Sequence, residues 1–186
     1  SDLLAAAGIT VGSYKSPDSE TLAKREAEQR KEAKKHAAQA KAVWNEALPI
    51  AGTLAEAYLR GRGITCQLPK SLRFHPNCWH GLTAKRYPAM VAAVQGNQLA
   101  AVHRTYLKTD GSGKADIEPS KMMLGATKRA AVRLSECRKH LVVAEGIETA
   151  LSLSSGLLSA PAGVWAALST SGMRGLALPP LAGHLT

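Results

Sequence analysis

The sequence predicts a mixed α/β protein, in which a long helix precedes an α+β subdomain and an incomplete parallel α/β unit. Three observations carry this prediction. A run without glycine or proline, rich in Ala, Glu, Lys and Arg, fills residues 18–48. Two apolar segments flank a Gly-Asn turn within residues 89–106. A strand–helix–strand pattern with short, fully apolar strands occupies residues 141–168, which is typical of a parallel sheet.

Residues 1–48 are predicted to be a loose lead-in, up to residue 15, followed by the long helix. Ser16, Pro17 and Asp18 offer a capping hydroxyl, a proline suited to the first helical position and an acid near the positive end of the helix dipole. Apolar residues gather only at the end of the run, so the helix is expected to dock by its C-terminal end. Eight Lys/Arg against seven Asp/Glu favour a solvated linker over a DNA-contacting basic helix.

Residues 49–139 are predicted to form a basic subdomain of helices and strands. Its first helix covers residues 53–60 and ends at the glycines that follow. Two strands should pair as an antiparallel hairpin around residues 95–98, because Gly and Asn tolerate the positive φ of tight turns. Extended segments are expected at 72–74, 89–94, 99–106, 121–125 and 131–134, with loops through 79–81 and 110–114.

Residues 140–186 are predicted to begin a second, parallel α/β unit. A strand, a helix, a strand and a short helix are expected in turn, and residues 184–186 resemble the beginning of a third strand. The four elements are expected at residues 141–144, 147–158, 164–168 and 173–178.

The formal charge of +10 is unevenly distributed. Residues 49–186 hold 16 Lys/Arg against 7 Asp/Glu, a net charge of +9. A polyanion such as nucleic acid is the expected partner, and plain solubility is the alternative. No apolar run reaches the roughly 18 residues of a membrane span, so no membrane partner is expected.

The three cysteines suit a reducing cytoplasm better than a disulfide scaffold. A zinc set is the alternative use of two of them, together with nearby histidines. That set has no Cys-x-x-Cys knuckle, so ordinary packing is favoured over zinc binding. Its members would be Cys66, His75, Cys78 and His80.

Glu145 and Gly146 follow the first apolar strand of the parallel unit at its C-terminal end, where open α/β sheets assemble their active sites. A glycine here lets the backbone turn sharply and lets a ligand approach closely. A carboxylate here is a suitable ligand for Mg²⁺ and can act as a general acid or base. The alternative is simple helix capping, which Glu148 would serve equally well.

The segment HLVVAEGIETALSLSSG resembles the first strand, glutamate and helix of a Toprim domain, shared by bacterial-type primases, topoisomerases and some nucleases. Over residues 40–186, the chain resembles Toprim primase-like proteins of phages, plasmids and mobile elements. The segments that carry this resemblance, in order, are AEAYLRGRGI, LPKSLRFHPNCWHG, RYPAMVAAV, LAAVHRTYL, DGSGKA, KMMLGATKRAAVRL, AEGIETALS and VWAALSTSGM.

The resemblance implies a DNA primase that makes RNA primers on single-stranded DNA by metal-dependent nucleotidyl transfer. Glu145 would be the catalytic and metal-binding residue, with Mg²⁺ or Mn²⁺, and Gly146 would contact the cofactor. Arg104, Lys121 and either Lys128 or Arg129 would hold the triphosphate and the template backbone. The net charge of +7 on residues 85–139 agrees with this role. Nucleoside triphosphates, single-stranded DNA and a replicative helicase are the implied partners.

The chain departs from the Toprim pattern in its acids. A Toprim centre combines the glutamate with an Asp-x-Asp pair on the third strand, and these carboxylates hold the metals of phosphoryl transfer. Here no aspartate follows Asp116 and no acid follows Glu148. The sequence therefore predicts a fragment or a natural truncation that binds Mg²⁺ poorly and makes no primers alone.

Two alternatives stay open. One is a Toprim nuclease, against which the basic subdomain argues. The other is a non-catalytic nucleic-acid-binding or adaptor module, which the missing aspartates favour.

Overall fold

The computed structural model describes residues 18–96, 100–136 and 139–179. The chain divides into two units, residues 1–32 and 33–186. The boundary falls within the long helix α2 (Ser19–Glu46), whose presence confirms the predicted helix. In the first unit the backbone N–H of Thr21 donates to Oδ1 of Asp18 at 2.7 Å. Asp18 thus accepts from one of the N–H groups that have no partner within the helix at its N-terminus. The predicted roles of Ser16 and Pro17 lie outside the described residues.

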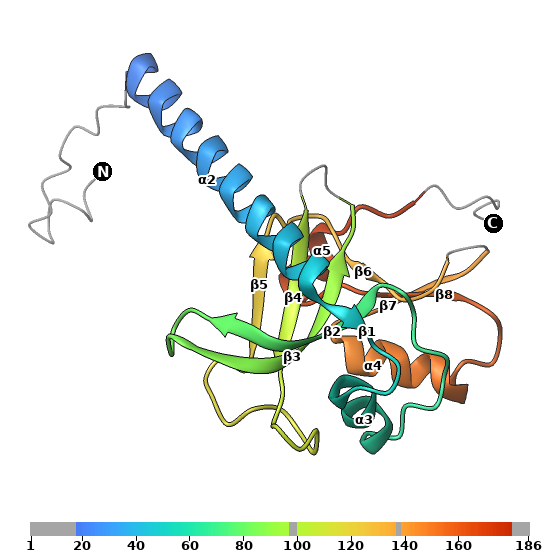
Figure 1. Cartoon of the computed structure of the whole chain (residues 1–186). Helices are drawn as coiled ribbons and strands as arrows, with labels where there is room; N and C mark the ends of the chain where they lie inside the picture. The colour runs from blue at the N-terminus through green and yellow to red at the C-terminus, as the bar shows by residue number, and fades with distance from the viewer. Residues whose placement is uncertain (1–17, 97–99, 137–138, 180–186) are drawn as a thin grey trace, which may run out of the picture. The chain divides into compact units, whose positions relative to one another are not determined.

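A five-stranded antiparallel sheet forms most of the second unit (Figure 1). The strands run in the order β1-β2-β3-β4-β5, and β3 with β4 confirms the predicted hairpin. Their bounds are β1 Leu48–Pro49, β2 Leu72–His80, β3 Lys85–Val94, β4 Ala101–Tyr106 and β5 Lys121–Gly125, and the short helix α3 (Leu54–Gly61) lies between β1 and β2 in the chain.

A second, three-stranded sheet has the order β6-β8-β7. β7 (Leu141–Ala144) and β8 (Gly163–Ala166) are parallel, as predicted, while β6 (Val132–Arg133) pairs antiparallel with β8. Helix α4 (Ile147–Ser152) and the π-helical turn η1 (Leu153–Leu157) connect β7 to β8, and α5 (Thr170–Gly175) follows. The mixed α/β class with a long preceding helix is therefore confirmed.

One apolar core joins the two sheets. It contains Leu59 of α3, Met90 of β3, Ile147 of α4 and Val164 of β8. The part of α2 that belongs to the second unit packs Ala40 against the other face of the large sheet, beside Val91 and Val102. A backbone bridge between Gln95 and Ala131 links the end of β3 to the start of the small sheet.

Residues 72–80 form one long strand, whereas only 72–74 were expected to be extended and 79–81 to be a loop. The pairing of β2 with β3 shifts register between His75 and Cys78. Pro76 falls in this bulge, where its missing N–H interrupts no ladder hydrogen bond.

The helices of the small unit also differ from the prediction. The expected helix 147–158 is α4 followed by η1, which is interrupted at Gly156 (φ 112°), a backbone conformation suited to glycine. The last helix is α5, three residues earlier than the expected 173–178, because the hydroxyl of Ser169 accepts from the N–H of Gly172 at 2.9 Å and sets its start. The predicted beginning of a third strand at 184–186 lies outside the described residues.

No helix in the described part of the chain is long and apolar enough to cross a membrane.

Candidate phosphate-binding pocket

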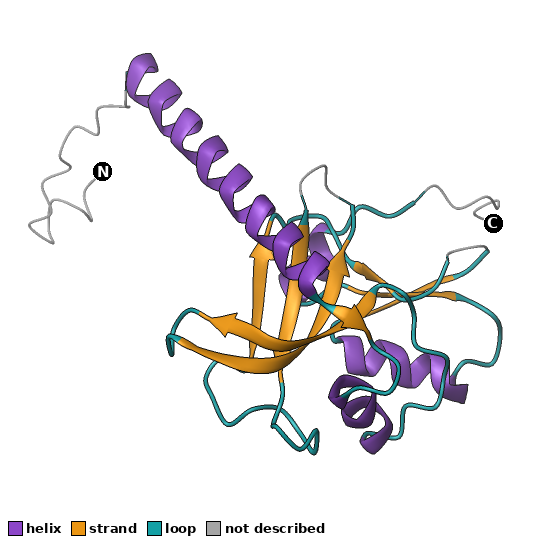
Figure 2. Ribbon diagram, in the orientation of Figure 1, coloured by secondary structure: helices purple, strands orange, loops and turns teal. Residues whose placement is uncertain are grey.

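A polar cavity of about 370 Å³ opens where β7 ends and α4 begins. Figure 2 shows α3 and α4 lying beside each other at this end of the strands. Both sheets contribute to the cavity, since His103 comes from β4 and Lys121 from β5. The full lining is Arg62, His103, Lys114, Lys121, Glu145, Gly146, Ile147, Glu148, Thr149 and Leu168.

Glu145 follows directly after β7, as the sequence predicts, and its side chain is exposed. Its backbone carbonyl accepts from the N–H of Leu168 at 2.8 Å, so the end of β7 is fixed to the segment after β8. No other described residue bonds to its carboxylate. Gly146 has φ −103° and ψ 153°, which any residue adopts. Residues 145 and 146 form a bend between β7 and α4 that does not require a glycine, and close approach of a ligand remains the expected role of Gly146.

Glu148 is buried and held by two partners. The Lys121 ammonium lies 3.0 Å from Oε2, and the Tyr58 hydroxyl donates to Oε1 at 2.9 Å. Burial alone would raise the pKa of Glu148, but Lys121, the carboxylate's own backbone N–H and Tyr58 outweigh it and lower the pKa to about 2. Burial and this carboxylate together raise the pKa of Tyr58. Glu148 thus joins α3, β5 and α4 as a buried anion.

His103 lies on the cavity wall with only 5% of its surface exposed. Its Nδ1 is enclosed and has no hydrogen-bond partner among the described residues. Burial, followed by the positive charge of Lys121, lowers the pKa of His103 to about 4. The imidazole is therefore neutral at physiological pH, and one of its ring nitrogens carries a hydrogen that it can donate.

Three cations converge on the cavity against two carboxylates. Lys114 stands on a loop closed by the backbone bridge between Leu107 and Lys114, and burial, then Lys121, lowers its pKa. Arg62 follows α3 and is exposed, with its guanidinium carbon 5.8 Å from the centre of the Tyr58 ring. Because Glu148 is committed to Lys121 and Tyr58, the arrangement suits an anion with several oxygens, such as a phosphate group.

The structure brings three of the predicted site residues into this cavity and leaves three outside its lining. Glu145, Gly146 and Lys121 line it. Arg104 is buried in the sheet, where it donates to the backbone carbonyls of Trp79 (3.3 Å) and Met123 (3.4 Å). His103 and Arg104 are neighbours on a strand, so they face opposite sides of it.

Lys128 and Arg129 are exposed in the turn between β5 and β6, outside the cavity lining. The sequence reasoning missed His103, Lys114 and Arg62. The signal for His103 was its adjacency to Arg104, because period-two alternation allows only one of the two side chains to face a given site.

The residues of the alternative zinc set do not gather. His75 bonds to Glu46, His80 bonds to Thr83 and the carbonyl of Pro119, and Cys66 lies near the carbonyl of Leu151. In the described ranges, no group of three His, Cys, Asp or Glu side chains could hold a metal ion.

Residues 34–134 match the model of a family described as a domain of unknown function, DUF7146. This range is more than half of the 186-residue chain. It begins at the start of the second unit and ends just after β6. No curated protein and no solved structure matches the chain.

Proposed function

Because the chain belongs to the DUF7146 family, whose function is unknown, we propose a function from the cavity itself. The chain is the phosphate-binding part of a Toprim-type DNA primase, a nucleotidyltransferase of phage or plasmid DNA replication. The observation that carries the proposal is the convergence of Lys114, Lys121 and Arg62 on one cavity with an unpaired carboxylate, Glu145, at the C-terminal end of a parallel strand.

Each residue of the cavity has a role in this proposal. The three cations hold the phosphates of a nucleoside triphosphate, and His103 donates a neutral hydrogen bond to one of their oxygens. Glu148 keeps Lys121 in place. Glu145 stands where the attacking hydroxyl and the reacting phosphate would meet, and it can accept a proton or share a metal ion.

The described residues do not form a self-contained metal site. Glu145 offers one free carboxylate, and Glu148 is occupied by Lys121 and Tyr58. Mg²⁺ is commonly bound through one or two carboxylates together with substrate phosphates. We therefore assign to Glu145 a single contact with Mg²⁺ or Mn²⁺ that forms only when nucleotide is present.

ATP binding to the purified chain tests this proposal. We expect Lys114→Gln to weaken ATP binding about tenfold or more, because a charge-assisted hydrogen bond contributes about 1.5–3 kcal/mol and tenfold corresponds to about 1.4 kcal/mol. Mg²⁺ should strengthen ATP binding by the unaltered chain and not by Glu145→Gln. Isothermal titration calorimetry measures both effects.

Lys108→Gln is the matched control. Lys108 lies on the same loop, pairs with Asp116 at 3.2 Å and does not line the cavity, so its loss should leave ATP binding unchanged. Equal weakening by the two lysine substitutions would contradict the proposal. Binding of single-stranded DNA without any ATP binding would favour the alternative of a non-catalytic nucleic-acid-binding or adaptor module.

The remaining partners follow from the same proposal. Single-stranded DNA is the template and a replicative helicase is the accompanying protein. The reducing cytoplasm is the proposed location, in agreement with two described cysteines that are free thiols.

A further inference from the structure

A second basic cavity, of about 660 Å³, lies away from the first. The two share no lining residue. We call this second cavity the Arg133 groove. It is lined by Pro69, Lys70, Ser71, Gln95, Arg133, Leu134, Ser135, Glu136, Trp165 and Pro179.

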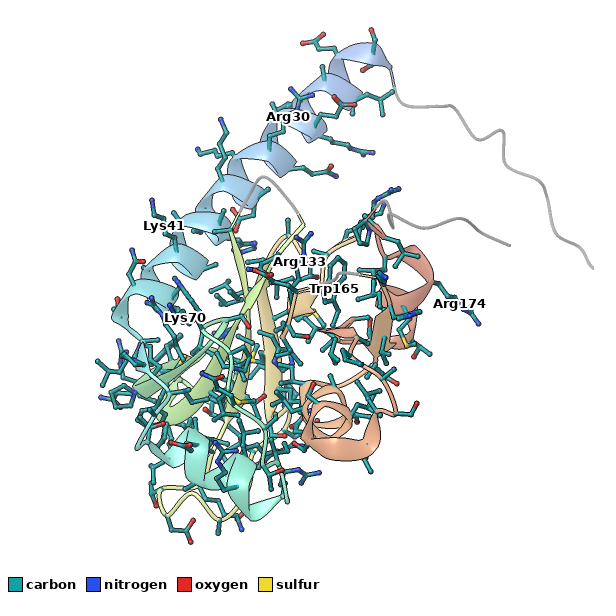
Figure 3. All side chains as sticks on the ribbon, turned by 90° about the vertical axis from the view of Figure 1, so that its right-hand side faces the viewer. Arg30, Lys41, Lys70, Arg133, Trp165 and Arg174 are labelled. Atoms are coloured by element: carbon teal, nitrogen blue, oxygen red, sulfur yellow. The ribbon has the colours of Figure 1, made fainter. Side chains whose placement is uncertain are left out.

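The groove is built on the face of the small sheet that α4 does not cover. Val164 and Ala166 of β8 pack in the core with α4, so Trp165 between them faces the opposite way. The guanidinium carbon of Arg133 lies 4.5 Å from the centre of the Trp165 ring (Figure 3). The Ser71 hydroxyl donates to the carbonyl of Arg133 at 2.8 Å, which fixes the β6 backbone at the groove wall. Arg133 is thus both exposed and held in orientation by the indole.

Neither basic side chain of the groove has an anionic partner among the described residues. No described carboxylate forms an ion pair with Arg133 or Lys70, although Glu136 lines the same groove. The indole Nε1 of Trp165 is buried and has no hydrogen-bond partner in the described ranges. Exposed cations left unpaired beside a groove are suited to contact an anionic ligand.

Two further exposed cations stand near groove-lining residues in the chain. The N–H of Ala177 donates to the carbonyl of Arg129 at 3.2 Å, so the segment between α5 and Pro179 runs beside the exposed 128–129 turn. Arg129 is exposed in that turn, and Arg174 is exposed on α5, the helix that precedes this segment.

We infer that the Arg133 groove binds single-stranded nucleic acid, whose bases stack on the Arg133 guanidinium and whose backbone phosphates contact Lys70. In single-stranded nucleic acids the exposed bases can stack on the planar guanidinium of an arginine. Positively charged grooves bind the phosphates of the same strand. This inference rests on the proposed function, because it gives the polynucleotide a place separate from the triphosphate pocket. Duplex nucleic acid keeps its bases paired, so it should bind more weakly.

Fluorescence anisotropy with labelled 20-mers of single-stranded DNA, single-stranded RNA and duplex DNA tests the inference. We expect Arg133→Gln to weaken single-strand binding about tenfold, which is within the range for one stacked base. Lys70→Gln should reduce the magnitude of the slope of log affinity against log salt by about 0.7, as for one phosphate contact on a single strand. Arg133→Lys keeps the charge but loses the planar stack, so it should recover only part of the affinity.

Lys41→Gln is the charge-matched control, since Lys41 is exposed on α2 and does not line the groove (Figure 3). Equal loss of affinity in Lys41→Gln and Arg133→Gln, or tighter binding of a polyglutamate peptide than of either single strand, would overturn the inference. ATP binding measured in the same Arg133 variant separates the two proposals. If Arg133→Gln binds both ATP and single-stranded DNA as the unaltered chain does, the groove inference is refuted and the phosphate pocket is not. If neither the unaltered chain nor any variant binds ATP, the proposal of the phosphate pocket is refuted.

Discussion

Replacing Glu148 by glutamine is expected to lower the free energy of unfolding by about 2–4 kcal/mol. Loss of one partner of a buried ion pair typically costs about 3–5 kcal/mol, and the partial exposure of Lys121 reduces this figure. The substitution leaves the Lys121 ammonium next to Lys114 without its counterion. It also weakens the bond from Tyr58, because a neutral amide replaces a charged acceptor.

Urea unfolding followed by circular dichroism measures this effect. Glu56→Gln is the matched control, because Glu56 pairs with Arg60 at 3.0 Å near the surface, where such pairs contribute about 0.3–0.5 kcal/mol, and a glutamine can still accept from the N–H of Gly52. A double-mutant cycle with Lys121→Met gives the coupling energy directly. A change below about 0.5 kcal/mol in Glu148→Gln would show that the buried carboxylate does not hold the three elements together.

The stability of the folded chain is expected to fall by up to about 3 kcal/mol as the pH drops from 6.5 to 4. The pKa of His103 is lowered to about 4 in the folded state by burial, Lys121, Arg104 and Lys114, against the opposing effect of Glu148. Between pH 6.5 and 4 the unfolded chain binds a proton at this histidine and the folded chain does not. Stability therefore rises with pH in this window, at about 1.4 kcal/mol for each unit of pKa difference.

Urea titrations at half-unit pH steps check this expectation. His103→Asn removes the titrating group. The slope of the free energy of unfolding against pH between 4 and 6.5 should therefore decrease by the amount that corresponds to one proton bound in the unfolded chain and not in the folded chain. Glu148 acts in a lower window. Its folded pKa of about 2 lies below its ordinary value of 4.5, so its stabilisation is present above pH 4.5 and lost as the pH falls towards 2. An unchanged slope in His103→Asn would mean that the imidazole is protonated in the folded chain.

Periodicity was sufficient to predict the strands whose neighbours in the chain are also their neighbours in space. The β3–β4 hairpin and β5 were found because alternating or continuous apolar residues end at clear turns. β2 was not found in full, because Pro76 argues against a strand unless a bulge accommodates it, and a bulge depends on the pairing partner. The start of α5 likewise depends on a hydroxyl contact from Ser169 rather than on periodicity.

The candidate site was predictable only in part, for a different reason. Glu145 could be found because it ends an apolar strand, which is a local signal. Lys121 came from the resemblance. Lys114 and Arg62 stand on segments far apart in the sequence, and only the pairing of β4 with β5 and the packing of α3 against α4 bring them to one cavity. Local patterns contain no information on such convergence.

The position of β6 means that the family match and the folding unit have different boundaries. The matched residues end at 134 and include β6, whereas β8, the strand to which β6 is paired, begins at Gly163. A chain that ends at the last matched residue would contain β6 without β8, the strand with which β6 pairs. Val132 would then lose its neighbours from β8 in the core. The matched residues therefore do not form a complete folding unit by themselves. A shortened chain that keeps β6 paired would have to extend from residue 33 through β8.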